Sequence, residues 1–320
     1  MKGKHSKWWK IALISVAFLL VLAVMAGWIY TQDKLNRINY AAPVVATNID
    51  ADGGEAKPQN QRGDLFEDST IHILLLGTDD SGEEFDDIAR ADAIMVLSAD
   101  LEKNTLRLAS LERGIGVPIP DQEKDWLTHV FAYGGADLMV ETVNEQFDAG
   151  VERYVRVNFT GFEEIVDAIG GVEIDLTEAE VAALQPLTVA DLEEGKNLLM
   201  GPDALQYARL RSIDSDFVRV QRQRTVMQAA LDKMSDLSLV QIDQLLNKVL
   251  PHVETNFTKA ELSQLLPYIP GFLGVEIDQR TIPDQEDILP GEYTSDGRLL
   301  TIIDFEQAAD DLERFFKTGR

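Results

Sequence analysis

The chain contains no cysteine and only four histidines among its 320 residues. Without cysteine it can form no disulfide bond, thiolate nucleophile or cysteine-ligated metal site. The sequence also lacks a Walker-type phosphate loop, a His-Glu-x-x-His zinc helix and a Gly-x-Ser-x-Gly nucleophile elbow. The histidines, which show no paired spacing, are His5, His72, His129 and His252. These absences argue against a serine or zinc hydrolase.

Basic side chains are scarce as well, because 29 Lys and Arg residues face 55 Asp and Glu residues and give a formal net charge of -26. Such a chain repels the phosphate backbone of nucleic acids, so we expect no nucleic-acid binding through general electrostatics. Five arginines nevertheless fall between residues 209 and 224. Arginine binds phosphate bidentately and keeps its charge, which makes this run the first candidate anion site.

A long apolar run lies near the N-terminus. Residues 11–30 carry no charged side chain, are long enough to cross a bilayer as one helix, and have aromatic residues at or near both ends. Lysines dominate residues 1–10, which predicts a cytoplasmic tail and places the rest of the chain outside the cell. A cleaved signal peptide ending near Ala26 is the alternative. We expect a single-pass anchor in the cell membrane and an exported domain.

The rest of the chain divides into a linker and an alternating part. Residues 31–69 hold Pro43, Pro58 and a Gly-Gly pair without helical or strand periodicity, and are predicted to be a linker. From residue 70, short apolar runs alternate with helical patterns, which predicts an α/β fold with helices on both sides of a sheet. We expect the functional domain over 70–235, and helices completing the fold over 236–320.

The expected elements are short and regularly spaced along the chain. Their approximate boundaries follow from the apolar periodicity and from the flanking turn residues. Strands are predicted at 71–76, 93–97, 105–111, 154–158, 172–176 and 273–282, and helices at 129–147, 160–169, 202–210, 216–234, 240–250, 258–267 and 303–317.

Two aspartates mark the ends of successive predicted strands. Asp79 follows the run 71–76, and Asp92 opens the next strand just after Arg90. Ligand sites of α/β sheets lie at strand ends, and two carboxylates together with substrate oxygens and water suit Mg²⁺. In the alternative interpretation Asp79 caps a turn and Asp92 pairs with Arg90.

Arg113 follows the predicted strand 105–111 and lies beside Gly114 and Gly116. Small neighbours let an arginine at a strand end approach a ligand closely. A solvated arginine at a strand end explains the same pattern equally well.

Within the arginine run, a helix that starts near Asp216 places Arg219 and Gln223 on one face, with Arg222 adjacent. Arg209 and Arg211 precede this helix. The alternative is an amphipathic helix whose solvated arginines pair with the surrounding acidic residues.

Several stretches occur in one order along residues 70–235. They are Leu-Leu-Leu-Gly-Thr-Asp79, Arg90-Ala-Asp92-Ala-Ile-Met-Val, Ser-Leu-Glu-Arg113, His129-Val-Phe-Ala-Tyr-Gly-Gly135, the segment 157–172, Gly-Pro-Asp-Ala-Leu-Gln-Tyr-Ala-Arg209-Leu-Arg211 and Asp216-Phe-Val-Arg219-Val-Gln-Arg222-Gln223-Arg. In this order they resemble the LytR-CpsA-Psr family of bacterial cell-wall glycopolymer ligases. The predicted N-terminal anchor fits the same family.

The resemblance implies a mixed central sheet sandwiched between helices, with an apolar pocket for a polyprenyl lipid. It implies a phosphotransferase that moves a glycopolymer from polyprenyl pyrophosphate to peptidoglycan. By the same resemblance, catalytic roles fall to Arg113, Arg209, Arg211 and Arg219, pyrophosphate binding to Arg90, Arg222 and Gln223, and Mg²⁺ binding to Asp79 and Asp92. Apolar residues of 71–76, 93–97 and 129–147 are candidates for the pocket lining, although ordinary core packing explains them equally well.

The chain departs from the family's usual Pro-Arg-Asp and has Glu112-Arg113-Gly114 at that place. The metal pair and the arginines of 209–223 are intact. The departure keeps a second hypothesis open, namely a non-catalytic paralogue that binds a polyprenyl phosphate or glycan in cell-envelope assembly or regulation.

Overall fold

A computed structural model describes most of the chain beyond the predicted membrane segment. The described residues are 30–41, 69–82, 85–86, 88–210, 212–213, 216–235, 237–272 and 275–319. The predicted anchor 11–30 therefore lies outside the described part except for its last residue. None of the helices described in residues 30–319 combines the length and the apolar character needed to cross a membrane.

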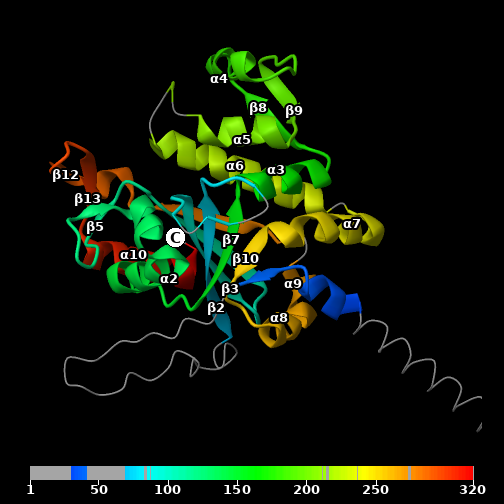
Figure 1. Ribbon diagram of the computed structural model, residues 1–320, viewed down its shortest axis with the longest axis horizontal. Helices are drawn as coiled ribbons and strands as arrows, with labels where there is room; N and C mark the ends of the chain where they lie inside the picture. The colour runs from blue at the N-terminus through cyan, green and yellow to red at the C-terminus, as the bar shows by residue number, and fades with distance from the viewer. Residues whose placement is uncertain are drawn as a thin grey trace, which may run out of the picture.

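The centre of the molecule is a seven-stranded mixed sheet with the order β1-β10-β7-β2-β3-β4-β11 (Figure 1). β2, β3 and β4 form an antiparallel meander, β7 runs parallel to β2, and β11 runs parallel to β4. The strands are β1 (Asn39–Tyr40), β2 (Thr70–Thr78), β3 (Ala91–Asp100), β4 (Thr105–Leu111), β7 (Arg153–Asn158), β10 (Val253–Thr255) and β11 (Ile277–Ile282). This arrangement confirms the predicted mixed central sheet.

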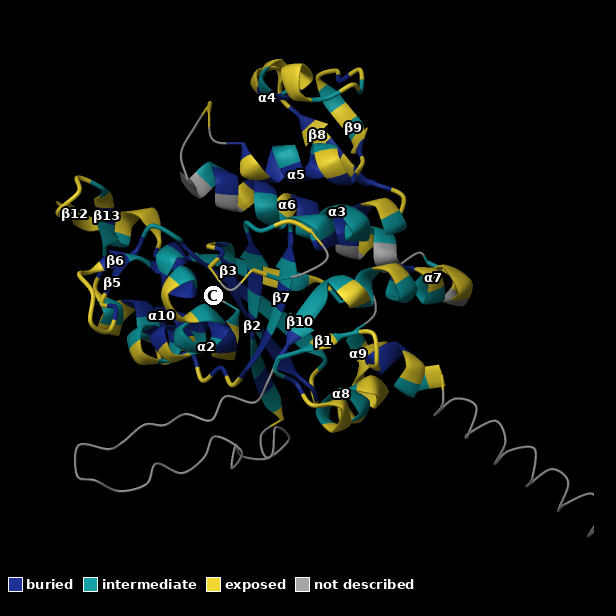
Figure 2. Cartoon of the chain, in the orientation of Figure 1, coloured by how far each residue is buried: buried dark blue, intermediate teal, exposed yellow. Residues whose placement is uncertain are grey.

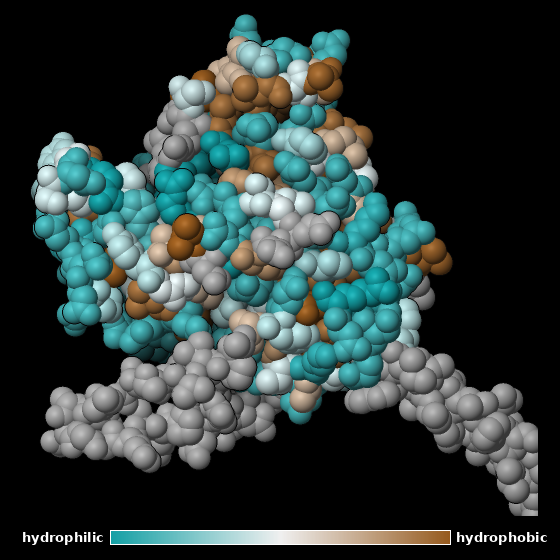
Figure 3. All heavy atoms as spheres, in the orientation of Figure 1, coloured by the Kyte–Doolittle hydropathy of each residue, from teal (hydrophilic) through white to brown (hydrophobic). Residues whose placement is uncertain are grey.

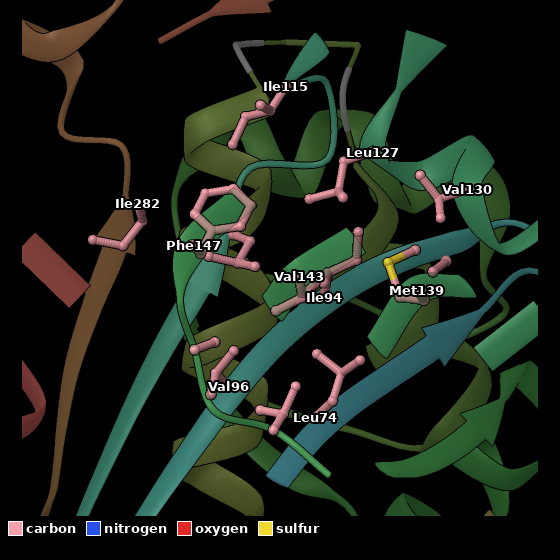
Figure 4. Close-up of a cluster of buried hydrophobic side chains, with 14 of the residues drawn as sticks. Leu74, Ile94, Val96, Ile115, Leu127, Val130, Met139, Val143, Phe147 and Ile282 are labelled. Atoms are coloured by element: carbon pink, nitrogen blue, oxygen red, sulfur yellow. The ribbon is translucent and has the colours of Figure 1, made fainter. Parts of the chain in front are cut away.

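One face of the sheet is covered by α2 (Leu127–Phe147) and α10 (Phe305–Thr318). Strand side chains alternate between the two faces. Leu74 and Leu76 of β2 and Ile94 and Val96 of β3 point to this face. Figure 4 shows Leu74, Ile94 and Val96 packed with Met139 and Val143 of α2. Burial of these side chains holds the helix layer on the sheet.

The other face meets a second group of helices and a hairpin at the end of the strands where β2 finishes (Figures 1 and 2). A separate apolar cluster holds this group together. Its elements are α3 (Phe159–Ala168), β8 (Val172–Leu176), α4 (Glu178–Leu184), β9 (Gly195–Leu199), α5 (Gly201–Arg209), α6 (Asp216–Ser235) and α7 (Leu239–Val249). Figure 3 shows that hydrophilic side chains dominate the visible surface, as the charge of the chain predicts.

The portion 236–320 is less helical than predicted. Besides α7, α8 (Lys259–Leu265), α9 (Ile269–Phe272) and α10, it supplies β10 to the sheet, together with β11, which confirms the strand predicted at 273–282. It also forms a hairpin of β12 (Leu289–Tyr293) and β13 (Leu299–Ile302). All five residues of β12 are exposed, so they show none of the apolar alternation that reveals a strand in a sequence. A further short pair joins β5 (Gly116–Val117) to β6 (Asp125–Trp126).

The predicted linker 31–69 is wrong for its first residues, which pack on the domain. Residues 30–35 are helical, and the Tyr30 hydroxyl donates to Asp243 of α7 over 2.6 Å. Lys34, which is 8% exposed, pairs with the same carboxylate. β1 then pairs with β10 at the edge of the sheet. The segment 30–41 is therefore part of the folded domain.

A buried ion pair ties α6 to α4. Arg222 Nε donates to Glu180 Oε1 over 2.7 Å, and Arg222 Nη1 donates to the Leu210 carbonyl over 3.0 Å. Burial alone would raise the pKa of Glu180, but hydrogen bonds from Thr177 and Arg222 and the positive charge of Arg222 outweigh burial and lower it. The two side chains therefore stabilise the fold as an ion pair, with both groups charged.

We expect Glu180→Gln to lower the free energy of unfolding by about 3 kcal/mol, because it removes the Glu180 carboxylate from the buried Arg222 guanidinium. Urea denaturation of the purified chain measures this loss. Glu178→Gln, at an exposed position of the same helix, is the matched control and should change stability by under about 0.5 kcal/mol. The difference between Glu180→Gln and the native chain should shrink as pH falls through the lowered pKa of Glu180, since the stabilisation exists only above it. Equal stabilities at pH 7 would contradict this role.

Candidate active site

A cavity of about 360 Å³ lies between the sheet and the helices α3, α5 and α6. Most of its lining is apolar and comes from Ala93, Met95, Val157, Phe162, Ile165, Val166, Leu205, Ala208, Val226, Met227 and Ala230. Polar residues also line it, and these are Thr78, Asp92, Asn158, Arg209, Arg219 and Gln223. Such a cavity suits a ligand with a long apolar part and an anionic head.

Helix α6 explains why one end of the cavity is polar. Arg219, Gln223, Val226 and Ala230 follow each other at spacings of four, three and four residues, so they share one helix face. The charged and amide side chains stand near the start of α6, and the apolar ones follow toward its end. We call Asp92, Arg209, Arg219 and Gln223 the polar end of the cavity.

A β-bulge turns Asp92 toward the cavity. Gly77 pairs with Ala93 and Thr78 pairs with Ala91, so Asp92 is an extra residue in β3. Regular alternation would place it on the α2 face with Ile94, but the bulge lets Asp92 and Ala93 both line the cavity. The bulge therefore delivers a carboxylate to the polar end.

Two ion pairs flank this point of the sheet. Asp92 Oδ1 accepts from Arg113 Nη1 over 2.6 Å. Asp79 Oδ1 accepts from the Arg90 backbone N–H over 2.7 Å, and Asp79 Oδ2 accepts from Arg90 Nε over 2.8 Å. The alternative pairing of Asp92 with Arg90 is wrong, because Arg90 pairs with Asp79. Arg113 is thus joined to the polar end through Asp92.

The residues fit Mg²⁺ only with help from a substrate. In residues 30–319, as far as they are described, no three acidic or histidine side chains form a metal cluster. Asp79 uses both oxygens for Arg90, whereas Asp92 meets Arg113 through Oδ1. Mg²⁺ commonly takes one or two carboxylates and completes its shell with water and substrate phosphates. Asp92 is the better placed of the two predicted ligands, since it alone lines the cavity.

Arg156 supports the site, although the sequence analysis predicted no role for it. It is 1% exposed on β7 and donates to Thr78 Oγ1, Asp80 Oδ2 and the Asp86 carbonyl. Burial would raise the pKa of Asp80, but hydrogen bonds from Thr78 and the Asp86 N–H, together with the Arg156 charge, lower it. This network fixes the chain just after β2, where Asp79 lies. An arginine inside the apolar strand Tyr154-Val-Arg-Val-Asn158 was the signal that could have revealed it.

The described site residues that the sequence predicted fall into three groups. Asp92, Arg209, Arg219 and Gln223 line the cavity, and Arg209 stacks on Phe159 with 4.3 Å between guanidinium and ring. Arg113, Asp79 and Arg90 lie beside it in the two ion pairs. Arg222 does not line the cavity, because its side chain is committed to Glu180. Arg211 lies outside the described residues.

The predicted apolar lining was correct only in part. Ala93 and Met95 line the cavity, but no residue of 129–147 does, and none of 71–76 appears beside Gly77 and Thr78 in the described lining. Helix α2 packs on the opposite face of the sheet and forms core there. Periodicity showed that these residues are buried without showing on which face.

The side chain of Glu112 lies against the backbone of Gly114. The Gly114 N–H donates to Glu112 Oε1 over 3.3 Å, and a Cβ at residue 114 would stand only 2.8 Å from that oxygen. Glu112 is 4% exposed. The carboxylate of residue 112 therefore fills the room that a side chain on residue 114 would need.

Comparison with known proteins agrees with this geometry. The model of the LytR_cpsA_psr family matches residues 38–309. The polyisoprenyl-teichoic acid–peptidoglycan teichoic acid transferase TagT of Bacillus subtilis (strain 168) is 33% identical over 291 residues, which cover 89% of this chain and 88% of TagT.

Solved structures show the same fold. TagT bound to LIIa-WTA superposes with a TM-score of 0.63 at 27% identity, covering 81% of this chain and 93% of that one. The family protein YwtF (TagT) with bound octaprenyl pyrophosphate lipid gives a TM-score of 0.60 at 24% identity, over 88% and 98% of the two chains. The family model and the identity to TagT together show that this chain belongs to the LytR-CpsA-Psr family.

Proposed function

We propose that this protein is a phosphotransferase that moves a glycopolymer from a polyprenyl pyrophosphate carrier to peptidoglycan. The observation that carries the proposal is the apolar cavity whose polar end gathers Arg209, Arg219, Gln223 and Asp92. The cavity matches an isoprenoid tail, and the arginines match a pyrophosphate. The relative TagT is named for transfer of teichoic acid from a polyisoprenyl carrier to peptidoglycan.

The geometry suits phosphoryl transfer. With the tail in the cavity, Arg209 and Arg219 face the phosphates. A peptidoglycan hydroxyl attacks the phosphorus that carries the polymer, the bond to the polyprenyl phosphate breaks, and the hydroxyl proton is released. Such reactions depend on positioning and on stabilising spread negative charge, which fixed guanidinium groups supply. Arg113 holds the Asp92 carboxylate in place beside them.

We further propose Mg²⁺ as cofactor, with Asp92 as its main protein ligand and Asp79 as the second. When bound, the cation would neutralise pyrophosphate charge. The partial exposure of Asp92, 24% for its side chain, leaves its carboxylate accessible to a cation brought by the substrate.

The proposal also includes a single-pass membrane anchor in residues 11–30, with the N-terminus cytoplasmic and the domain outside. The uncharged run and the preceding lysines support it. The packing of residues 30–41 on α7 and β10 supports a domain held next to the anchor.

Arg219→Ala and Asp92→Ala should each lower transfer by about 100-fold or more, because each removes a charge at the reacting phosphates. The assay uses magnesium, a short polyprenyl-pyrophosphate glycan and peptidoglycan oligomers. Lys196→Ala, at an exposed residue paired with Glu173, is the control and should keep native activity. Tight lipid binding by a native chain that shows no transfer would favour the non-catalytic paralogue instead.

Removal of divalent cations should abolish transfer, and added Mg²⁺ should restore it. A second measurement does not depend on turnover. It follows Mn²⁺ binding by electron paramagnetic resonance with a polyprenyl-pyrophosphate analogue present. Asp92→Asn should weaken Mn²⁺ binding by about tenfold or more, since it removes a charged ligand. Mn²⁺ binding unaffected by both Asp92→Asn and Asp79→Asn would rule out this metal site.

The full chain should remain with membranes after carbonate extraction, whereas a chain that starts at residue 30 should be released. Because the native sequence has no cysteine, a single cysteine at the exposed Val189 can report sidedness. An impermeant thiol reagent should label it in intact cells. Labelling only after lysis would contradict the proposed orientation.

A further inference from the structure

Helix α6 separates the cavity from a second hollow on its other side. Residues 221, 224, 225 and 228 of α6 face this hollow, whereas 219, 223, 226 and 230 face the cavity. Two adjoining depressions, of about 640 Å³ and 370 Å³, share Gln221, Arg224 and Gln279. We call the two together the amide trough.

The chemistry of the amide trough differs from that of the cavity. Its walls carry the amides of Gln221, Gln228, Gln279 and Gln285. The Gln279 amide donates to Gln228 Oε1 over 3.0 Å, which links α6 to β11. Amide groups donate and accept hydrogen bonds at once, as sugar hydroxyl and N-acetyl groups also do. The trough therefore suits a polar, largely uncharged ligand better than a lipid.

The charges of the trough are balanced, in contrast with the acidic chain as a whole. Arg280 pairs with Asp284 over 2.6 Å, and Asp232 accepts from Gln228 over 2.7 Å. Arg224 contributes the other positive charge, and its buried Nε has no hydrogen-bond partner among the described residues. A buried donor of this kind is satisfied when a ligand brings an acceptor oxygen.

The trough lies beside the chain segment that carries Arg113. Thr281 and Pro283, which line it, flank Ile282. The Ile282 carbonyl accepts the N–H of Glu112 over 2.9 Å, and the next residue is Arg113. Arg113 binds Asp92 at the polar end of the cavity. A ligand in the trough would thus lie next to the segment that carries Arg113, on the side of α6 opposite the lipid.

We infer that the amide trough binds the acceptor, a glycan strand rich in N-acetyl and hydroxyl groups, and presents its hydroxyl to the polar end. This assignment rests on the proposed transferase function. The donor's own sugars share the same chemistry. They are attached to the pyrophosphate at the cavity, however, and the acceptor must enter by another route.

The test measures binding of a soluble peptidoglycan tetrasaccharide to the full chain in detergent by calorimetry, without donor lipid. Arg224→Gln and Gln279→Ala should each weaken binding by about tenfold, as expected for loss of one good hydrogen bond. Gln244→Ala, at an exposed residue of α7, is the matched control and should bind as the native chain does. Thermal unfolding of each variant checks that the fold is intact.

In the transfer assay, the same two variants should raise the KM for the acceptor while the KM for the donor and kcat stay near native values. Unchanged tetrasaccharide binding in both variants, or no binding by the native chain, would overturn the assignment. A raised KM for the donor instead would show that the trough holds donor sugars. Tetrasaccharide binding that depends on Arg224 in a chain without transferase activity would refute the proposed function while the trough assignment stands.

Discussion

A buried guanidinium group must meet a carboxylate or a ligand, and this constraint organises the structure. Arg222 meets Glu180 and joins α6 to α4. Arg156 meets Asp80 and Glu254 and fixes the chain after β2. Each of these pairs removes an arginine from the surface and links elements far apart in the sequence. Burial of an unpaired charge would cost several kcal/mol, so the pairs and the fold require each other.

The same constraint shows how far the sequence could lead. Apolar periodicity located β2, β3, β4, β7 and β8, because a short apolar run or a regular apolar alternation indicates a buried strand without knowledge of its neighbours. The arginine run was correctly recognised as unusual, and helical spacing brought Arg219 and Gln223 together. Arg222 was predicted to bind pyrophosphate, but it pairs with Glu180, which lies 42 residues earlier in α4. Only tertiary structure brings the two together.

Other features escaped prediction for related reasons. The segment 30–41 has no periodicity of its own and takes its structure from α7 and β10, to which it pairs. The bulge at Asp92 depends on the register between two strands, which no single-strand pattern reveals. The departure at Glu112-Arg113-Gly114 reads in the sequence as a lost acid. In the structure the Glu112 carboxylate occupies the space beside Gly114, so an acidic group remains next to Arg113.

The docking of the segment 30–41 gives the cavity a direction relative to the proposed anchor. Tyr30 contacts Asp243 and Lys34 contacts Asn247, so this helical turn runs parallel to α7 (Figure 1). α7 begins soon after α6 ends. The cavity residue nearest that end of α6 is Ala230. It lies eleven residues, or about 16 Å, along the helix from Arg219. With an anchor in residues 11–30, the apolar end of the cavity faces the side from which the chain leaves the membrane. Under the proposed anchoring and function, the polar end would then face outward, toward the cell wall that supplies the acceptor.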